Sequence, residues 1–295
     1  MSFRGKMGNV EIELAELRSS NDIIGDEAAL RERLEEEGYL LIRGLFTRDE
    51  IRAAKADLAD RLHQSGRLEE GAPAIDAVIG ADNKSAMFGS IKTDFAAEFP
   101  NYAAVVDSPK VFSFFDRLLG GKTISYDYKW PRAVARNDFT GAHYDIVYMG
   151  RGTKKVYTMW TPLDDVAIGQ GPLAVCLGSQ NFHKVKETYG EMDVDRDNIA
   201  YGWISKDPLE VVEKFGGQWA TTNFRAGDVI VFGMYLMHAS LNNTTGRYRI
   251  SSDTRYQLAS EPADERWVGA GRKGHYAWGQ TPPTPMEEAK AKWKL

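Results

Sequence analysis

The first 121 residues carry their hydrophobic and polar positions mostly at helical spacing. Helices are predicted over residues 26–37, 48–64 and 108–121, and a short apolar strand over residues 39–46. Thr47 and Glu50 form a T-x-x-E capping box before the second helix, in which each side chain bonds the other residue's backbone N–H. Pro109 suits the first turn of the third helix, and Gly38 follows the last residue of the first. This part of the chain is expected to flank a core.

The pattern changes between about residues 122 and 260 to short runs of Val, Ile, Tyr, Phe, Thr and Trp separated by Gly, Pro, Asn and Asp. Such runs between turn formers predict antiparallel strands folded as a sandwich or barrel. The candidate strands cover residues 123–130, 142–149, 155–163, 173–177, 228–233, 239–243 and 248–258. An insertion at 183–221 carries a helix candidate at 207–216, and the tail at 261–295 ends in another. No repeat or linker divides the chain, which predicts one domain over residues 1–295, mainly β with flanking helices.

Composition narrows the expected partners. At 295 residues, with 43% hydrophobic and 27% charged positions, the chain can bury a sizeable core without a disulfide or structural metal. A formal net charge of −5 gives no reason to expect nucleic acid, so a small molecule is the expected partner. The lone cysteine, Cys176, and an N-terminus without a signal-like apolar segment predict a cytoplasmic protein. No apolar run approaches the ~18 residues that span a bilayer, so no membrane partner is expected.

The stretch GAHYDIVYMG, residues 141–150, places a histidine and an aspartate two positions apart in a short apolar run. In a strand, residues i and i+2 project to the same face, so His143 and Asp145 would converge while Tyr144 points away. The H-x-D pair alone is a weak signal for a metal. A facial triad of two histidines and one carboxylate needs a second histidine from a distant strand and leaves three coordination positions open.

His238 can supply that second histidine. It follows the strongly apolar stretch GDVIVFGMYLM, where an unpartnered polar side chain would be costly. Arg249 lies eleven residues further on in another strand-like run, and Ser240 lies two residues beyond His238. A buried arginine needs a partner, and its planar fork matches a carboxylate. Arg247 and Arg255 would share a strand face with Arg249, so spacing alone does not choose among the three arginines.

The order of these motifs resembles the phytanoyl-CoA dioxygenase family. The resemblance rests on His143-x-Asp145, Trp160, the segments GPLAVCLGSQ and AGDVIVF, His238-x-Ser240 and Arg249, and it covers about residues 30–260 in element order. Members of that family are iron(II)- and 2-oxoglutarate-dependent oxygenases built on a double-stranded β-helix. The resemblance therefore implies a jelly-roll, cupin-like core. It also implies hydroxylation of a small molecule, with consumption of 2-oxoglutarate and O2 and release of succinate and CO2.

The resemblance assigns two groups of ligands. The ligands of Fe(II) would be His143, Asp145 and His238. The distal carboxylate of 2-oxoglutarate would be bound by Arg249 and Ser240. Because related halogenases replace the metal-binding carboxylate with a small residue, Asp145 favours hydroxylation, desaturation or ring formation over halogenation.

Further residues are candidates for contacts with the ligands. Trp160 would pack beside 2-oxoglutarate, and Lys129 could reach one of its carboxylates. The candidate substrate contacts are Tyr126, Tyr128, Arg132, Asn137 and Trp203, with Trp219 as a second aromatic of a lid. The family usually has Gly-Ser-His where this chain has Gly178-Ser179-Gln180, so His183 is a candidate substitute for that histidine. The remaining histidines, His63 and His275, are expected at the surface.

Two other classes of protein remain open from the sequence. A cupin-type isomerase or hydrolase could use zinc or manganese in the same two-histidine, one-aspartate site, but it would not use Arg249 and Ser240 to bind a carboxylate. A non-catalytic binding module could keep the barrel without turnover, although a decayed site would be expected to lose a metal ligand first.

Overall fold

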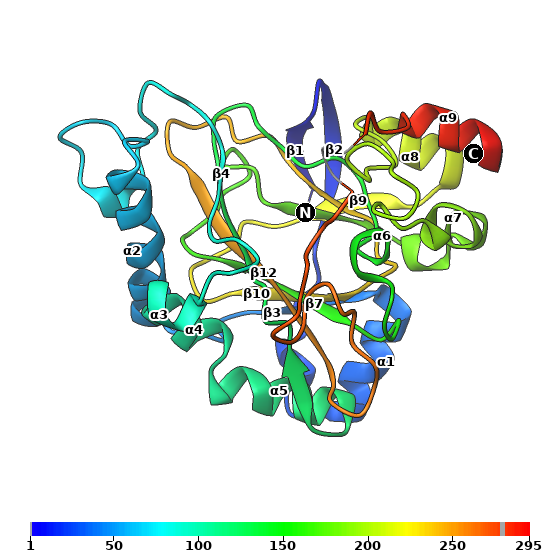
Figure 1. The fold of residues 1–295 in the computed structure, drawn as a ribbon, viewed down its shortest axis with the longest axis horizontal. Helices are drawn as coiled ribbons and strands as arrows, with labels where there is room; N and C mark the ends of the chain where they lie inside the picture. Colours follow the sequence, from blue (N-terminus) through cyan, green and yellow to red (C-terminus); the bar gives the residue numbers. More distant parts are fainter. Residues whose placement is uncertain (1, 278–280) are drawn as a thin grey trace.

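Two β-sheets form the centre of the molecule in the computed structural model, which describes residues 2–277 and 281–295 (Figure 1). The smaller sheet contains, in spatial order, β1 (Ser2–Met7), β2 (Val10–Glu16), β9 (Gln218–Thr221), β8 (Leu173–Leu177) and β11 (His238–Ser240). The larger sheet contains β3 (Tyr39–Ile42), β10 (Val229–Gly233), β7 (Tyr157–Pro162), β12 (Arg249–Leu258), β6 (Trp130–Val134) and β4 (Ala86–Met87), and β5 (Thr123–Ser125) also pairs with β12. Except for β2 with β9, the described strand pairs are antiparallel, as expected for a jelly roll.

The central strands of the larger sheet are buried on both faces. On β10, Ile230 and Phe232 point into the core between the two sheets. Val229 and Val231 point the other way, into a core shared with helices. A strand buried on both faces is expected to be continuously apolar, which explains the unbroken run VIVF in this part of the sequence.

Helices cover the outer face of the larger sheet and one end of the molecule. The first group is α1 (Glu27–Glu37), α2 (Arg48–Gln64), α3 (Phe95–Glu98), α4 (Pro100–Val106) and α5 (Pro109–Leu119), which contribute to one core with that sheet. The second group is α6 (Ile146–Met149), α7 (His183–Glu187), α8 (Pro208–Phe215) and α9 (Met286–Trp293), which pack with residues of the smaller sheet. Short 3-10 turns lie at Asn21–Ile23, Ala74–Asp76, Ser179–Asn181 and Tyr189–Glu191.

The helix ends follow the sequence signals closely. The capping box of Thr47 and Glu50 forms in full at the start of α2. Gly38 ends α1 in the left-handed conformation, with φ 80°, and its N–H bonds to the carbonyl of Leu34. Ser108 accepts a hydrogen bond from the N–H of Val111 at the start of α5, with Pro109 at the first helical position.

Several predicted strands are wrong or too long. Residues 142–149 do not form a strand, because His143 makes one isolated bridge and the chain then turns into α6. Residues 123–130 are divided into β5 and the start of β6, and the apolar run at 39–46 gives only the four-residue β3. The hairpin of β1 and β2 was not predicted, although its second strand alternates apolar and polar residues after a Gly-Asn loop.

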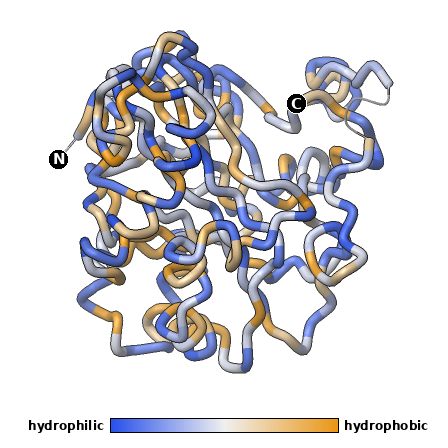
Figure 2. The backbone as a smooth tube through the Cα atoms, turned by 60° about the vertical axis from the view of Figure 1, so that its left-hand side comes forward, coloured by the Kyte–Doolittle hydropathy of each residue, from blue (hydrophilic) through white to orange (hydrophobic). Residues whose placement is uncertain are grey.

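The hydrophobic stretches of the chain are short. Figure 2 shows them interrupted by hydrophilic positions along the backbone. Within the described residues, no helix has both the length and the apolar character needed to cross a bilayer.

Candidate active site

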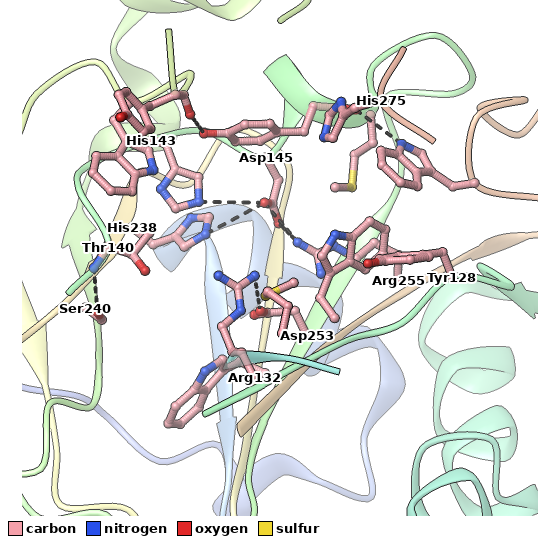
Figure 3. A pocket seen from close by; sticks show the side chains of 18 of the residues that line it. Tyr128, Arg132, Thr140, His143, Asp145, His238, Ser240, Asp253, Arg255 and His275 are labelled. Carbon is pink, nitrogen blue, oxygen red and sulfur yellow. Dashed lines mark hydrogen bonds and ion pairs between the residues drawn. The ribbon is translucent and has the colours of Figure 1, made fainter. Parts of the chain in front are cut away.

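A cavity of about 480 Å³ is lined by residues of both sheets, and the three predicted metal ligands lie in its wall (Figure 3). The Nε2 atoms of His143 and His238 lie 3.9 and 3.8 Å from Oδ1 of Asp145. One candidate ligand atom from each residue lies within 4.8 Å of the other two, and all three side chains are buried. Metal bonds to imidazole and carboxylate are about 2.0–2.2 Å long, so small side-chain movements would let these atoms share one ion.

The backbone places the two imidazoles side by side. The N–H of His143 bonds to the carbonyl of His238 at 3.0 Å, and the reverse bond has the same length. Nδ1 of His143 lies 2.8 Å from the carbonyl of Gly141, and Nδ1 of His238 lies 3.0 Å from that of Leu236. Since a carbonyl can only accept, each Nδ1 carries the proton, and each Nε2 keeps its lone pair for a metal.

Asp145 reaches the same point by a turn rather than by strand alternation. Its backbone is already helical, with φ −65° and ψ −26°, directly before α6. Nη2 of Arg255 bonds to both carboxylate oxygens at 3.0 and 3.1 Å, and the hydroxyl of Thr158 donates to Oδ2. Figure 3 shows the histidines on one side of the carboxylate and Arg255 on the other.

The charges around the cluster keep its groups in the forms that bind a cation. Burial alone would raise the pKa of Asp145, but opposing interactions, of which the charge of Arg255 is the largest, outweigh it and hold the pKa well below its usual range. Burial, together with the charge of His238, lowers the pKa of His143 to about 3. At neutral pH the cluster therefore offers an ionised carboxylate and, at His143, a neutral imidazole.

Arg249 is a buried cation without an anionic partner. It is 2% exposed, lines the cavity from the start of β12, and donates from Nη1 to the hydroxyl of Ser251. Its Nε has no hydrogen-bond partner, and no ion pair with a carboxylate forms in the described part of the chain. Burial, then the charge of Arg132, lowers its pKa to about 10, so it remains protonated at neutral pH. A buried, unpaired guanidinium is suited to bind an anionic ligand such as a carboxylate.

The structure distinguishes the three candidate arginines. Arg255 lines the cavity but is already paired with Asp145. Arg247 precedes β12 and lies outside this cavity. Ser240 and Trp160, the other predicted contacts of 2-oxoglutarate, line the cavity with Arg249. Ser240 accepts a hydrogen bond from the N–H of Thr140 at 2.8 Å, which leaves its hydroxyl proton able to donate to a ligand.

Four predicted contact residues do not reach the cavity. Nζ of Lys129 lies 2.9 Å from a carboxylate oxygen of Asp107 and is otherwise bonded near β5. Tyr126 is buried in the core, and Asn137 is exposed in a turn with φ 67°. Trp219 is also a core residue, whose indole donates to the carbonyl of Pro208, so it does not belong to a lid.

Three predicted substrate contacts do line the cavity, namely Tyr128, Arg132 and Trp203. The structure adds residues that sequence reasoning missed or misplaced, namely Tyr148, Tyr201, Asp253, Trp267, Lys273 and His275. His275 was expected at the surface, but its ring packs 4.8 Å from that of Trp267 in the cavity wall. His63 is exposed, as expected, and the exposed His183 lies outside the cavity.

The Gly178-Ser179-Gln180 segment contacts the main chain next to His238. The hydroxyl of Ser179 accepts a hydrogen bond from the N–H of Met237, the residue before His238, at 2.8 Å. Gln180 points elsewhere, since its amide donates to the carbonyl of Glu36. The glutamine thus leaves the metal ligands undisturbed.

Comparisons with known proteins agree with this geometry. A family model described as Phytanoyl-CoA dioxygenase (PhyH) matches residues 34–251. A 1-deoxypentalenic acid 11-beta-hydroxylase of Streptomyces arenae is 26% identical over 246 residues, covering 81% of this chain and 83% of the relative. The ectoine dioxygenase of Stutzerimonas stutzeri is 27% identical over 231 residues, covering 74% of this chain and 72% of the relative.

A solved structure supports the fold. The crystal structure of EctD from S. alaskensis with 2-oxoglutarate and 5-hydroxyectoine matches with a TM-score of 0.56 at 18% identity, covering 92% of each chain. This likeness confirms the predicted double-stranded β-helix core.

Proposed function

The chain belongs to the phytanoyl-CoA dioxygenase family and is an iron(II)- and 2-oxoglutarate-dependent dioxygenase, and we propose how its own residues hold these ligands and hydroxylate a small molecule. One observation carries the assignment of residues. The buried His143, Asp145 and His238 cluster shares a cavity with Arg249, a buried cation without a carboxylate partner in the described chain. Iron with 2-oxoglutarate and O2 supplies the oxidising chemistry, with release of succinate and CO2.

His143, Asp145 and His238 would hold the iron and leave its remaining positions facing the cavity. The carbonyls of Gly141 and Leu236 fix both imidazoles in the ligand tautomer. Arg255 holds the carboxylate of Asp145 by both oxygens and so sets its orientation.

Arg249 would bind the distal carboxylate of 2-oxoglutarate, with Ser240 donating a second hydrogen bond. The aromatic ring of Trp160 lies beside this position, 5.9 Å from the guanidinium of Arg249. The isomerase or hydrolase alternative has no use for such an anion site, and an intact cluster argues against a decayed binding module.

The substrate would occupy the remaining space beside the metal. Tyr128, Trp203 and Trp160 offer apolar surface that excludes water, and Arg132 is paired with Asp253 at 2.9 Å. The protein's part in the reaction is to hold one C–H bond near the metal and keep the cavity dry. We also propose that the enzyme works in the cytoplasm, consistent with its single, buried cysteine, Cys176.

The test is succinate formation from 2-oxoglutarate with Fe(II), ascorbate and O2, measured with and without candidate small molecules. The proposal predicts succinate release by the wild-type protein and none by Asp145→Ala, whose cluster lacks a ligand. Turnover of a substrate that requires Zn(II) or Mn(II) and no 2-oxoglutarate would instead support the isomerase or hydrolase. A protein that binds no metal and releases no succinate would support the binding module.

A further inference from the structure

One wall of the cavity comes from a segment outside the family match. The segment of residues 264–277, here called the C-terminal wall, follows β12 and runs towards α9 (Figure 1). Trp267, Lys273, Gly274 and His275 of this wall line the cavity, whereas the family model ends at residue 251. The metal ligands and Arg249 thus lie in the matched region, and this wall lies outside it.

A buried ionic network holds the C-terminal wall in place. Arg266 is 1% exposed and donates to Asp264 and Asp195, in each case with a shortest distance of 2.6 Å. Asp195 also accepts from Nδ1 of His275 at 2.8 Å and from the N–H of Tyr276 at 3.0 Å. Since charge-assisted bonds in a buried site are strong, this network ties the C-terminal wall firmly to the segment around Asp195.

The C-terminal wall adds an aromatic surface to the cavity. The ring of Trp267 packs 5.4 Å from that of Tyr128 and 5.0 Å from that of Trp130. Its indole donates to the carbonyl of Tyr148 at 3.2 Å, and its carbonyl accepts from the N–H of Tyr128. These contacts present a fixed, apolar face that suits a rigid hydrocarbon body.

The charged residues of the cavity indicate which charge suits a substrate. Among the described lining residues, the cations are Arg132, Arg249, Arg255 and Lys273, and the carboxylates are Asp145 and Asp253. Both carboxylates are already paired with arginines, and a divalent metal with a dianionic cosubstrate adds no net charge. An excess of positive charge therefore remains. Lys273 is exposed at the rim and forms no ion pair in the described chain.

We propose that the C-terminal wall selects the substrate, and that this substrate is a small carboxylate with an apolar, ring-like body. The body packs on Trp267, Tyr128 and Trp130, and the carboxylate pairs with Lys273 at the cavity rim. This inference rests on the proposed function for the position of the reacting C–H bond, but the binding preference can be measured separately.

The test uses a matched pair of probes, 1-adamantanecarboxylate and its neutral amide, 1-adamantanecarboxamide. Each is titrated without O2 into the protein loaded with Fe(II) and 2-oxoglutarate, and binding is followed by tryptophan fluorescence and by the visible absorption of the loaded centre. Wild type should bind the acid about two- to fivefold more tightly than the amide, as expected for a partly exposed ion pair. Lys273→Met should abolish this preference and leave amide binding unchanged. Lys92→Met, at an exposed lysine outside the cavity, should keep the preference.

A second pair of variants tests the aromatic surface. Trp267→Leu should weaken both probes by a similar factor and leave 2-oxoglutarate binding intact, whereas Trp293→Leu, outside the cavity, should change neither. Equal binding of acid and amide by wild type, a preference that survives Lys273→Met, or no binding of either probe at millimolar concentration would overturn the inference. Failure of the wild type to form the complex with Fe(II) and 2-oxoglutarate would instead count against the proposed function. In that case the probe preference is measured by fluorescence on the metal-free protein.

Discussion

Replacing Arg255 with methionine should destabilise the metal-free protein strongly and the metal-bound protein much less. Arg255 and Asp145 are 3% and 2% exposed, and one guanidinium nitrogen bonds both carboxylate oxygens. Without Arg255 the carboxylate stays buried, with Thr158 as its remaining hydrogen-bond donor in the described chain. Breaking one side of a buried ion pair costs about 3–5 kcal/mol. At ~2–4 °C per kcal/mol, the melting temperature of the metal-free variant should fall by about 6–20 °C.

A divalent ion supplies the positive charge that the variant lacks. With metal bound, the loss is limited to the charge-assisted hydrogen bonds, about 1.5–3 kcal/mol. By linkage, the difference of about 2 kcal/mol must appear as tighter metal binding in the variant, roughly 30-fold. The assay is thermal unfolding with increasing Mn(II), which avoids oxidation. The stabilisation by Mn(II) should be larger in Arg255→Met than in wild type, and Arg255→Lys should lie between them.

The opposite result would refute this reasoning. If Arg255→Met binds Mn(II) more weakly than wild type, then Arg255 favours metal binding, by orienting the Asp145 carboxylate, more than its positive charge disfavours it. A metal-free variant as stable as wild type would show that Asp145 is solvated or protonated rather than paired.

Four further outcomes are expected. Arg249→Ala should raise the Kd for 2-oxoglutarate at least about 30-fold, because a buried charge pair is lost, and it should leave the stabilisation by Mn(II) unchanged. In the same titrations, Arg247→Ala should change neither the Kd for 2-oxoglutarate nor the stabilisation by Mn(II). His238→Ala should abolish the stabilisation by Mn(II) in thermal unfolding, because two ligands remain. Burial alone would raise the pKa of Glu210, but hydrogen bonds from two lysines and a serine outweigh it and hold the pKa at about 2. The stabilising effect of the ionised Glu210 is therefore complete above pH about 4.5 and is lost as the pH falls towards 2. By urea unfolding, Glu210→Gln should be about 1–2 kcal/mol less stable than wild type at pH 7 and equally stable near pH 2. Thr47→Ala should lower the free energy of unfolding by about 1 kcal/mol in the same assay, because the capping box of α2 is lost.

The features that the sequence predicts well depend on local chemistry. The capping box at Thr47 and the glycine after α1 act within a few residues, so neighbouring letters suffice to place them. The cluster of His143, Asp145 and His238 was also predictable, because few other arrangements use two distant histidines and a carboxylate in apolar runs.

The strand predicted at 142–149 shows the limit of such reasoning. A short apolar run with Val, Ile and Tyr fits a strand and a buried helix equally well, and here tertiary contacts select the helix α6. His143 and Asp145 still converge, because the main chain turns at the aspartate. The chemistry was therefore predicted from a wrong local geometry.

The alternation of side chains along a strand explains the error at Lys129. Tyr128, just before β6, and Trp130 and Arg132 within it line the cavity from alternate positions. Lys129 lies between Tyr128 and Trp130 and points away, so the period of two already argued against it as a ligand contact.

No motif marks the C-terminal wall, because its position depends on an ionic network between distant segments.

The mutual backbone hydrogen bonds of His143 and His238 have a practical consequence. These main-chain hydrogen bonds hold the two imidazoles side by side, so the metal site is formed before any ion binds. Stripping with a chelator and reloading should then be a simple equilibrium that needs no refolding. Manganese, cobalt and nickel should enter the same place as iron, which makes inert substitutes suitable for trapping the enzyme with its substrate.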